Sequence, residues 1–346
     1  MSLIRTVIVD DSAFVRKTVR EMLSRSPHIE VVGMARNGED ALQMVEELKP
    51  DVVTCDLNMP EMDGVGFVRK QMARKPIPIL ILTASPQDAA LVLEALEAGA
   101  VDFVQKPTAL ATEELLAVRE ELVQKVKDAA AAPPQTLLLP APVNGLEAPP
   151  ERPPIAKKAD IVVLGISTGG PQALRYLIPQ FGADFPVPLV IVLHIPVGYT
   201  ALFAEKLSEL SKLPVKEAYE GCFVEPRQAL LAPAGHHLSF NKKRSGRVVV
   251  QLSSQPSNKP HRPSVDVLFQ SAAEVYRNRA LGVVMTGMGD DGKQGAAWIK
   301  AQGGTILTES EKSCVIYGMP RSVVEAGLSD AAVPLESMAQ EIYKRI

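Results

Sequence analysis

Short apolar runs alternate with amphipathic stretches along most of this chain, in two separate blocks. The first block contains five such runs: Thr6–Val9, Val31–Ala35, Asp51–Cys55, Ile79–Leu82 and Phe103–Val104. The second block begins at Asp160, and its runs are Ile161–Leu164, Leu189–Leu193, Ala229–Ala232, Val248–Leu252, Leu281–Met285 and Thr305–Leu307. Strands that alternate with helices form a parallel sheet with helices on both faces. The pattern therefore predicts two doubly wound α/β domains, a (βα)5 domain followed by a Rossmann-like one.

A proline-rich segment separates the two blocks. Residues 127–158 contain eight prolines, and the apolar periodicity stops there. Proline has no N–H to donate to a sheet and cannot continue the interior of a helix, so this segment is predicted to be an extended linker. The predicted domains are residues 3–126 and 159–346. The short apolar run Leu137–Leu139 within the linker could dock onto one of them.

Charge and cysteine content limit the classes of function. A formal net charge of −3 gives no basic surplus for nucleic acid. The three cysteines form neither a C-x-x-C pair nor a disulfide framework, which suits a reducing compartment. Met1–Arg5 shows no signal-peptide core, and no run reaches the ~18 apolar residues of a membrane span. We therefore expect a cytoplasmic protein that does not insert into membranes and binds no nucleic acid.

Carboxylates and a lysine follow three strands of the first domain. Asp10 and Asp11 follow the first predicted strand, Asp56 follows the third, and Lys106 follows the fifth. The carboxyl ends of parallel strands converge on one edge of the sheet. Three converging carboxylates repel one another, and a hard divalent cation such as Mg²⁺ relieves that repulsion. The alternative is that Asp10 and Asp11 only cap the following helix.

Such an acidic site suits a phosphatase or a kinase as well, and two further residues narrow the choice. A hydroxyl from Thr83 and the ammonium of Lys106 are suited to hold a phosphoryl group formed on the metal-bound carboxylate. The set Asp10-Asp11, Asp56, Thr83-Ala84 and Lys106-Pro107 resembles the receiver domain of two-component response regulators. That resemblance implies phosphorylation of Asp56 by a histidine kinase, Mg²⁺ held by Asp10, Asp11 and Asp56, a switch through Thr83 and Lys106, and a cis bond before Pro107.

A glycine-rich turn follows the first strand of the second domain. The run from Gly165 to Gly169 fits G-x-S-x-G, a strand-to-helix turn that lifts a serine hydroxyl above a sheet. Glycine-rich turns also cradle phosphates at helix N-termini, so a nucleotide-binding loop is an alternative. Neither G-x-G-x-x-G nor G-x-x-x-x-G-K-[ST] is found at this turn. Ser167 is therefore a candidate nucleophile that needs a base and a carboxylate.

Both partners occur at the carboxyl ends of other strands. His194 follows Leu189–Leu193, and the pair Asp290-Asp291 comes shortly after Leu281–Met285. An imidazole takes the proton of an attacking hydroxyl, and a carboxylate fixes the imidazole tautomer. The chain order serine, histidine, acid differs from the order serine, acid, histidine of α/β-hydrolases. We therefore expect a hydrolase domain that is not an α/β-hydrolase.

The motifs together resemble the chemotaxis protein-glutamate methylesterase family, in which a receiver and a linker precede the catalytic domain. The resemblance covers nearly the whole chain and includes G-I-S-T-G-G-P from Gly165, H-x-P from His194, the run His261–Asp266, T-G-M-G-x-D-G from Thr286, and Tyr317–Arg321. It implies the following roles: nucleophile Ser167, general base His194, orienting carboxylate Asp291, and oxyanion donors Met288 and Thr168. The family pattern places the catalytic carboxylate just before the final glycine, which selects Asp291 over Asp290.

The same resemblance implies the reaction and the partners. The expected reaction is hydrolysis of glutamate γ-methyl esters on the cytoplasmic helices of chemoreceptors, with release of methanol, without a cofactor and under activation by phosphorylation. The same site could also deamidate receptor glutamines. Two other classes of function stay open for the second domain: a DNA-binding output, for which residues 159–346 show no basic recognition helix, and a binding module that has lost catalysis.

The run His261–Asp266 permits two interpretations. Arg262 could lie at the rim of the cleft and meet an acidic receptor surface. Alternatively, the run could be a polar loop in which Ser264 caps a helix.

Overall fold

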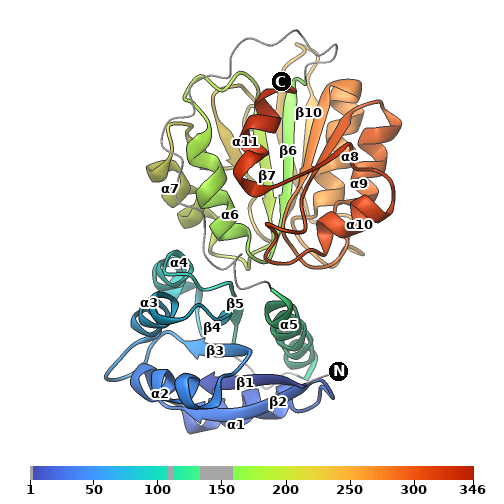
Figure 1. Ribbon diagram of the computed structural model, residues 1–346. Coiled ribbons are helices and arrows are strands. Elements are labelled where there is room, and N and C mark those ends of the chain that lie inside the picture. The colour runs from blue at the N-terminus through green and yellow to red at the C-terminus, as the bar shows by residue number, and fades with distance from the viewer. Residues whose placement is uncertain (1–2, 107–111, 133–158) are drawn as a thin grey trace. The chain divides into compact units, whose positions relative to one another are not determined.

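The computed structural model describes residues 3–106, 112–132 and 159–346. These residues form two compact units, which are separated in the chain by the segment 133–158 (Figure 1). Pro107 and Leu137–Leu139, for which the sequence predicts a cis bond and a docking contact, lie outside the described residues. Within the described ranges, no helix combines the length and the apolar character needed to cross a membrane.

The first unit is a five-stranded parallel sheet with helices between its strands. The strand order is β2-β1-β3-β4-β5, and every pairing is parallel. The elements are β1 (Ile4–Val9), α1 (Ala13–Leu23), β2 (Ile29–Ala35), α2 (Gly38–Leu48), β3 (Val52–Asp56), α3 (Gly64–Arg74), β4 (Ile79–Thr83), α4 (Ala89–Glu97), β5 (Asp102–Gln105) and α5 (Thr112–Ala131). The predicted (βα)5 architecture is confirmed.

Burial and capping explain where these elements form. Strands β3 and β4 are buried along their whole length, as expected for strands with helices on both faces. The side chains of Ser12, Asn37 and Asp63 accept hydrogen bonds from N–H groups in the first turns of α1, α2 and α3. Helix α5 runs to Ala131, past residue 127 where the predicted linker begins, because its side chains, Ala129 among them, are buried in the core.

The second unit contains a seven-stranded, wholly parallel sheet of order β14-β13-β12-β6-β7-β9-β8. Its elements are β6 (Ile161–Ile166), α6 (Gly170–Leu177), β7 (Leu189–Leu193), α7 (Thr200–Leu210), β8 (Val215–Glu217), β9 (Ala229–Leu231), β10 (His237–Lys242), β11 (Val248–Ser253), α8 (Val265–Tyr276), β12 (Ala280–Val284), α9 (Lys293–Ala301), β13 (Thr305–Glu309), α10 (Met319–Glu325), β14 (Ala331–Val333) and α11 (Leu335–Tyr343). Strands β10 and β11 form a separate antiparallel hairpin, so the predicted strand Val248–Leu252 lies outside the parallel sheet.

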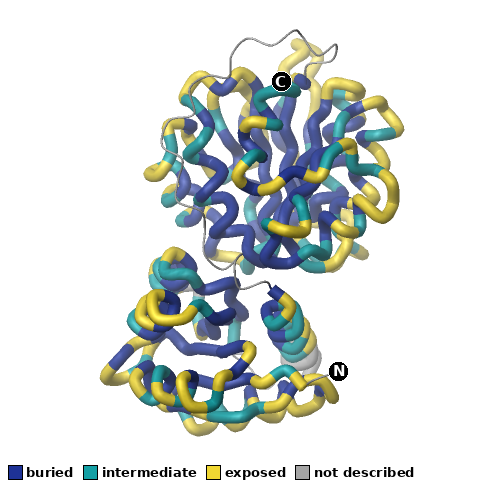
Figure 2. The backbone as a smooth tube through the Cα atoms, in the orientation of Figure 1, coloured by how far each residue is buried: buried dark blue, intermediate teal, exposed yellow. Residues whose placement is uncertain are grey.

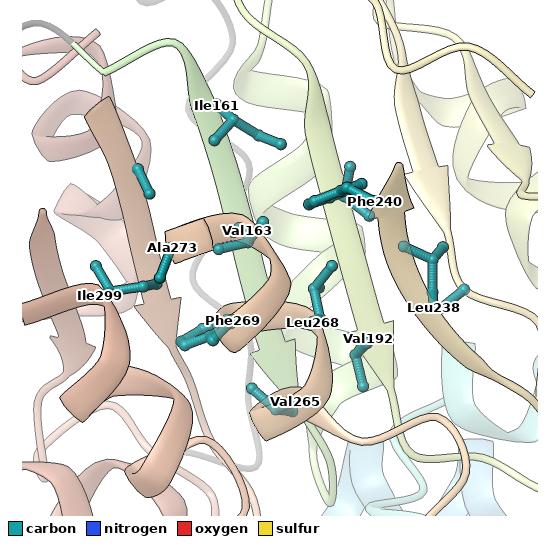
Figure 3. Close-up of a cluster of buried hydrophobic side chains, with 14 of the residues drawn as sticks. Ile161, Val163, Val192, Leu238, Phe240, Val265, Leu268, Phe269, Ala273 and Ile299 are labelled. Atoms are coloured by element: carbon teal, nitrogen blue, oxygen red, sulfur yellow. The ribbon is translucent and has the colours of Figure 1, made fainter. Parts of the chain in front are cut away.

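One hydrophobic core cluster of the second unit lies between this sheet and α8. Strands β6 and β7 are buried along their whole length (Figure 2). Side chains of α8, including Leu268 and Phe269, lie over Val163 and Val192 of these strands, and Phe240 of the hairpin closes the cluster at one side (Figure 3). Burial of side chains of this size contributes about 1.5–3 kcal/mol each. This packing fixes the end of α8 that faces the candidate site.

Each parallel sheet has a point at which successive connections run in opposite directions. In the first sheet this point lies between β1 and β3, and in the second it lies between β6 and β12. Ligands of open α/β sheets bind at the carboxyl ends of strands at such a point. Asp10 and Asp56 lie at the first of these points. Ser167 and the loop that follows β12 lie at the second.

Candidate active site

Ser167 lies in a tight turn between β6 and α6. It follows β6 directly, and its carbonyl accepts a hydrogen bond from Gly170 N at 2.6 Å. Gly169 between them has φ of 78°, a left-handed conformation that favours glycine. Ser167 is only partly buried. The turn therefore presents its hydroxyl at the carboxyl edge of the sheet.

A second loop, which follows β12, packs tightly against this turn. Ser167 N donates a hydrogen bond to Thr286 O at 3.0 Å. A Cβ atom at Gly287 would lie 2.7 Å from Ser167 Cβ and 2.5 Å from Met319 Sδ. The close approach of the two loops therefore requires glycine at position 287.

His194 lies beside Ser167 on the neighbouring strand end. Its backbone N donates to Ile166 O at 3.1 Å, and its Nε2 lies 2.9 Å from Asp291 Oδ2. Because a carboxylate only accepts, Nε2 carries the proton and Nδ1 keeps its lone pair. Nδ1 is buried, and no group in the described part of the chain hydrogen-bonds to it, Ser167 Oγ included. Hydrogen bonds between nucleophile and base commonly tighten only when substrate binds.

The N-terminus of α8 holds Asp291. Oδ1 accepts hydrogen bonds from Ser264 Oγ at 2.8 Å and Asp266 N at 3.0 Å, and Oδ2 accepts one from Val265 N at 2.7 Å. Burial raises the pKa of Asp291, but the hydrogen bond and charge of His194 and the two backbone donors outweigh burial and hold this pKa well below its usual range. Asp291 is therefore ionised and fixed in orientation. Its neighbour in the sequence pair is exposed.

Two backbone N–H groups near Ser167 are available to a ligand. Met288 follows Gly287, and Thr168 follows Ser167 in the turn. Among the described residues, none accepts a hydrogen bond from the N–H of Met288 or of Thr168. Thr168 is itself buried, and its carbonyl accepts from Thr286 Oγ1 at 3.0 Å. Unpaired N–H groups beside a nucleophile are suited to bind an oxyanion.

The run His261–Asp266 combines features of both interpretations. Ser264 precedes α8 as its N-cap residue, but its hydroxyl donates to Asp291 and makes no hydrogen bond to the helix. Arg262 is exposed. The ring of His261 stacks on that of His194 with centroids 4.3 Å apart, a contact that was not predicted from the sequence. In the sequence, only the resemblance of the run His261–Asp266 to the family motif indicated that it lies near the candidate site.

In the first unit, three carboxylates converge as expected. Ligand oxygens of Asp10, Asp11 and Asp56 lie within 4.8 Å of one another. Lys106 Nζ lies 2.6 Å from Asp10 Oδ2 and 2.9 Å from Asp56 Oδ1. Burial raises the pKa of Asp56, although the charge and hydrogen bond of Lys106 oppose this effect. The donor set is all oxygen and carries more negative charge than one lysine balances, which fits a hard divalent cation such as Mg²⁺.

Thr83 lies at the end of β4, next to Leu82, which pairs with Asp56 of β3. Its hydroxyl donates weakly to Ser85 O and Asp88 Oδ2, at 3.3 and 3.4 Å. Its carbonyl accepts from Lys106 N at 2.6 Å, so the two residues are joined through the backbone. Asp88, which also accepts from Asn58 at 3.3 Å, was not predicted from the sequence. Its position in a short helical turn carries no motif.

Comparisons with known proteins agree with this geometry. Residues 162–342 match the family described as CheB methylesterase, and residues 6–118 match the response regulator receiver domain. Protein-glutamate methylesterase/protein-glutamine glutaminase 5 of Myxococcus xanthus is 48% identical over 100% of this chain and 99% of its own length. The protein-glutamate methylesterase/protein-glutamine glutaminase of Pyrococcus horikoshii is 38% identical over 99% of this chain and 94% of its own.

A solved structure gives the same result for the second unit. The crystal structure of the Thermotoga maritima CheB methylesterase catalytic domain has a TM-score of 0.53 and 38% identity, and the match covers 55% of this chain and 100% of that one. Together with the full-length relatives, this likeness covers both units. The chain therefore belongs to the CheB methylesterase family and carries a response regulator receiver domain.

Proposed function

We propose that this methylesterase hydrolyses γ-methyl esters of glutamate side chains in chemoreceptors, with Ser167 as nucleophile, His194 as general base and Asp291 as its orienting carboxylate. The observation that carries the proposal is the hydrogen bond from His194 Nε2 to the ionised Asp291, next to the Ser167 turn. The names of the Myxococcus and Pyrococcus relatives combine methylesterase and glutaminase, which supports an ester and a primary amide as substrates of one site.

The reaction follows from the free ring nitrogen. Ser167 Oγ attacks the ester carbonyl while its proton passes to His194 Nδ1, and the N–H groups of Met288 and Thr168 bind the oxyanion. The intermediate collapses, and methanol leaves with the proton from His194. Water, deprotonated by the same imidazole, then hydrolyses the glutamyl-serine ester and restores the hydroxyl. With a glutamine side chain the leaving group is ammonia. The chemistry requires no cofactor.

The receiver supplies the regulation. A histidine kinase transfers a phosphoryl group to Asp56, and Lys106, now 2.9 Å from Asp56 Oδ1, pairs with that group. Asp10, Asp11 and Asp56 would hold Mg²⁺, which would neutralise charge at this site when bound. Thr83 and Lys106, joined through their backbones, transmit the change. Phosphorylation relieves inhibition of the esterase, and a coupling of about 1–3 kcal/mol gives a 5–150-fold effect.

The proposed enzyme and its partners meet in the cytoplasm. Its substrates are the methylated cytoplasmic helices of receptors, and its phosphoryl donor is a soluble or receptor-linked histidine kinase. The exposed Arg262 lies on the segment that holds Asp291, and it is placed to meet carboxylates on such a helix.

Replacement of the nucleophile tests the catalytic assignment. Ser167→Ala should reduce methanol release from methylated receptor by about 10⁴–10⁶-fold. It should also abolish labelling by a serine-directed fluorophosphonate. Ser245→Ala, in the exposed β10–β11 turn, is the matched control and should behave as the parent. Near-normal hydrolysis by Ser167→Ala would contradict the assignment.

The regulatory assignment is tested with the full-length chain. Acetyl phosphate and Mg²⁺ should raise methanol release by the parent protein and leave Asp56→Asn at its basal rate. An equal response of both proteins would place the activating phosphoryl group elsewhere.

A further inference from the structure

Glu309 is a buried acid that the proposed mechanism leaves unused. It ends β13, and its side chain is fully buried. Oε2 accepts a hydrogen bond from Thr286 N at 2.9 Å, and Oε1 accepts one from Ser313 Oγ at 3.0 Å. Buried acids rarely persist without a set of donors of this kind, so the environment is built for an acceptor.

The N–H of Thr286 donates to Glu309, and Thr286 joins three segments of the site. Its carbonyl accepts from Ser167 N at 3.0 Å. Its hydroxyl donates to Thr168 O at 3.0 Å and accepts from Ile316 N at 3.0 Å. Gly287, which meets Ser167 Cβ, comes next in the chain. The orientation of Thr286 therefore sets both the serine turn and the loop that carries the Met288 N–H.

We propose that Glu309 is a positioning residue for ester hydrolysis and acts as a carboxylate that fixes Thr286, and through it Ser167 and the Met288 N–H. Glu309 makes no contact with the proposed reacting atoms, so its effect passes through the backbone. The inference rests on the proposed function, since it needs Ser167 to be the nucleophile.

The ionisation of Glu309 lies near neutral pH. Burial raises the pKa of Glu309 to about 7, although the hydrogen bonds from Thr286 and Ser313 oppose this rise, and the charge of Glu336 on α11 adds to it. Burial and the neighbouring carboxylate also raise the pKa of Cys314, which stays a neutral thiol. A protonated carboxyl is a neutral acceptor, and hydrogen bonds to a neutral acceptor are roughly half as strong as those to a carboxylate.

Protonation of Glu309 therefore loosens Thr286 and lowers the rate. The acid limb of kcat/KM then contains the ionisation of Glu309. A displacement of about 1 Å at a reacting group costs about 10²-fold in rate. The slope of log kcat/KM against pH on the acid side should accordingly be steeper in the parent than in a variant whose residue 309 cannot ionise.

Two substitutions at this position test the proposal, in the full-length chain and with rates expressed per fluorophosphonate-reactive site. Glu309→Gln offers Thr286 N a neutral acceptor at every pH, as the protonated acid does, and cannot ionise near neutrality, so its alkaline plateau should lie about 3–10-fold below that of the parent and its acid limb should be less steep. Glu309→Leu removes the acceptor and should lower kcat by about 10–10²-fold with KM within about twofold. Glu311→Gln, at an exposed side chain, is the matched control and should keep the parental profile.

The outcomes separate a positioning role from a merely structural one. A structural role predicts fewer reactive sites in Glu309→Leu with unchanged kcat per site, and it predicts the same acid limb in Glu309→Gln and the parent. Either of these results overturns the proposal, and the Glu309→Gln profile can be measured even if Glu309→Leu does not fold. Failure of the proposed function would look different. The parent would then show no labelling at Ser167, and Ser167→Ala would keep the parental activity.

Discussion

His194 Nε2 lies 2.9 Å from Asp291 Oδ2, and a pair of helix N-termini fixes this carboxylate. Asp291, in the loop before α9, accepts three hydrogen bonds from the start of α8. In return, Asp266 in the first turn of α8 accepts hydrogen bonds from Gly292 N at 2.9 Å and Gly295 N at 2.8 Å at the start of α9. Each helix thus caps the other through an acid, and anionic groups are stabilised at helix N-termini. The imidazole of His194 is therefore oriented by the packing of two helices.

Replacement of Asp291 by asparagine should lower kcat by about 10⁴-fold, the scale known for a triad acid whose loss permits the wrong tautomer. The amide introduced by Asp291→Asn can donate to His194 Nε2, which would place the proton on Nδ1, where Ser167 needs an acceptor. Asp290→Asn is the matched control, because Asp290 is exposed and does not contact the imidazole. Methanol release from methylated receptor measures both variants. Equal losses in the two would mean that Asp291 does not orient the base.

The sequence predicts the parts of the site that combine a strand end with a motif. Ser167, His194 and Asp291 each follow a buried apolar run, and parallel strands bring such ends to one edge of the sheet. The sequence does not predict which other residues hold these three side chains in place. Ser264 looks like an ordinary helix cap, and nothing local shows that its hydroxyl donates to an acid 27 residues further along the chain. Glu309 ends a strand without any motif.

The fold shows the same division between local and long-range information. The five strands of the receiver follow from their apolar runs, whereas β8 and β14 contain only three residues each and find their place through pairing with a neighbouring strand. Helix α5 extends past the predicted domain boundary because its last turns are buried against the core. The periodicity of an alanine-rich stretch does not indicate such burial.

Gly287→Ala should lower esterase activity by about 10²-fold while the receiver stays folded. The added Cβ would lie 2.7 Å from Ser167 Cβ and 2.5 Å from Met319 Sδ, so the serine turn or the loop must shift. A shift of about 1 Å costs about 10²-fold in rate. Gly289→Ala, two residues away in the same loop, meets no atom within 4 Å and carries only the cost of its positive φ. Comparison of kcat for the two variants separates close packing from loop strain, and a larger loss in Gly289→Ala would contradict the packing argument.

Lys106→Met should destabilise the receiver and make its stability depend more strongly on Mg²⁺. The substitution leaves the buried Asp10 and Asp56 without an opposite charge, a change that typically costs about 3–5 kcal/mol. Mg²⁺ at the acidic cluster restores part of that charge, and a ligand that binds only the folded state raises Tm. Scanning calorimetry of the full chain should therefore show a larger Mg²⁺-dependent rise of the Tm of the receiver in Lys106→Met than in the parent.

Lys70→Met, at an exposed position on α3, is the control and should match the parent. If Mg²⁺ did not change the Tm of Lys106→Met, the result would argue against metal binding at these carboxylates.

Glu309 should make the catalytic unit less stable as pH rises toward neutrality. Its pKa is raised from 4.5 to about 7 by burial, against the opposing hydrogen bonds, so the folded state binds the proton more tightly than the unfolded state does. The resulting stabilisation is complete below pH ~4.5 and is lost as pH rises through about 7, a change on the order of 3 kcal/mol. Urea unfolding at pH 5.5 and pH 8 should show Glu309→Gln gaining stability relative to the parent at the higher pH, whereas Glu311→Gln should follow the parent at both. If the difference between Glu309→Gln and the parent does not change with pH, Glu309 ionises normally in the folded state. The predicted activity has the opposite dependence on pH, because the carboxylate that orders Thr286 is the form that burial disfavours. A carboxylate acceptor beside the Ser167 turn at neutral pH therefore lowers the stability of the catalytic unit.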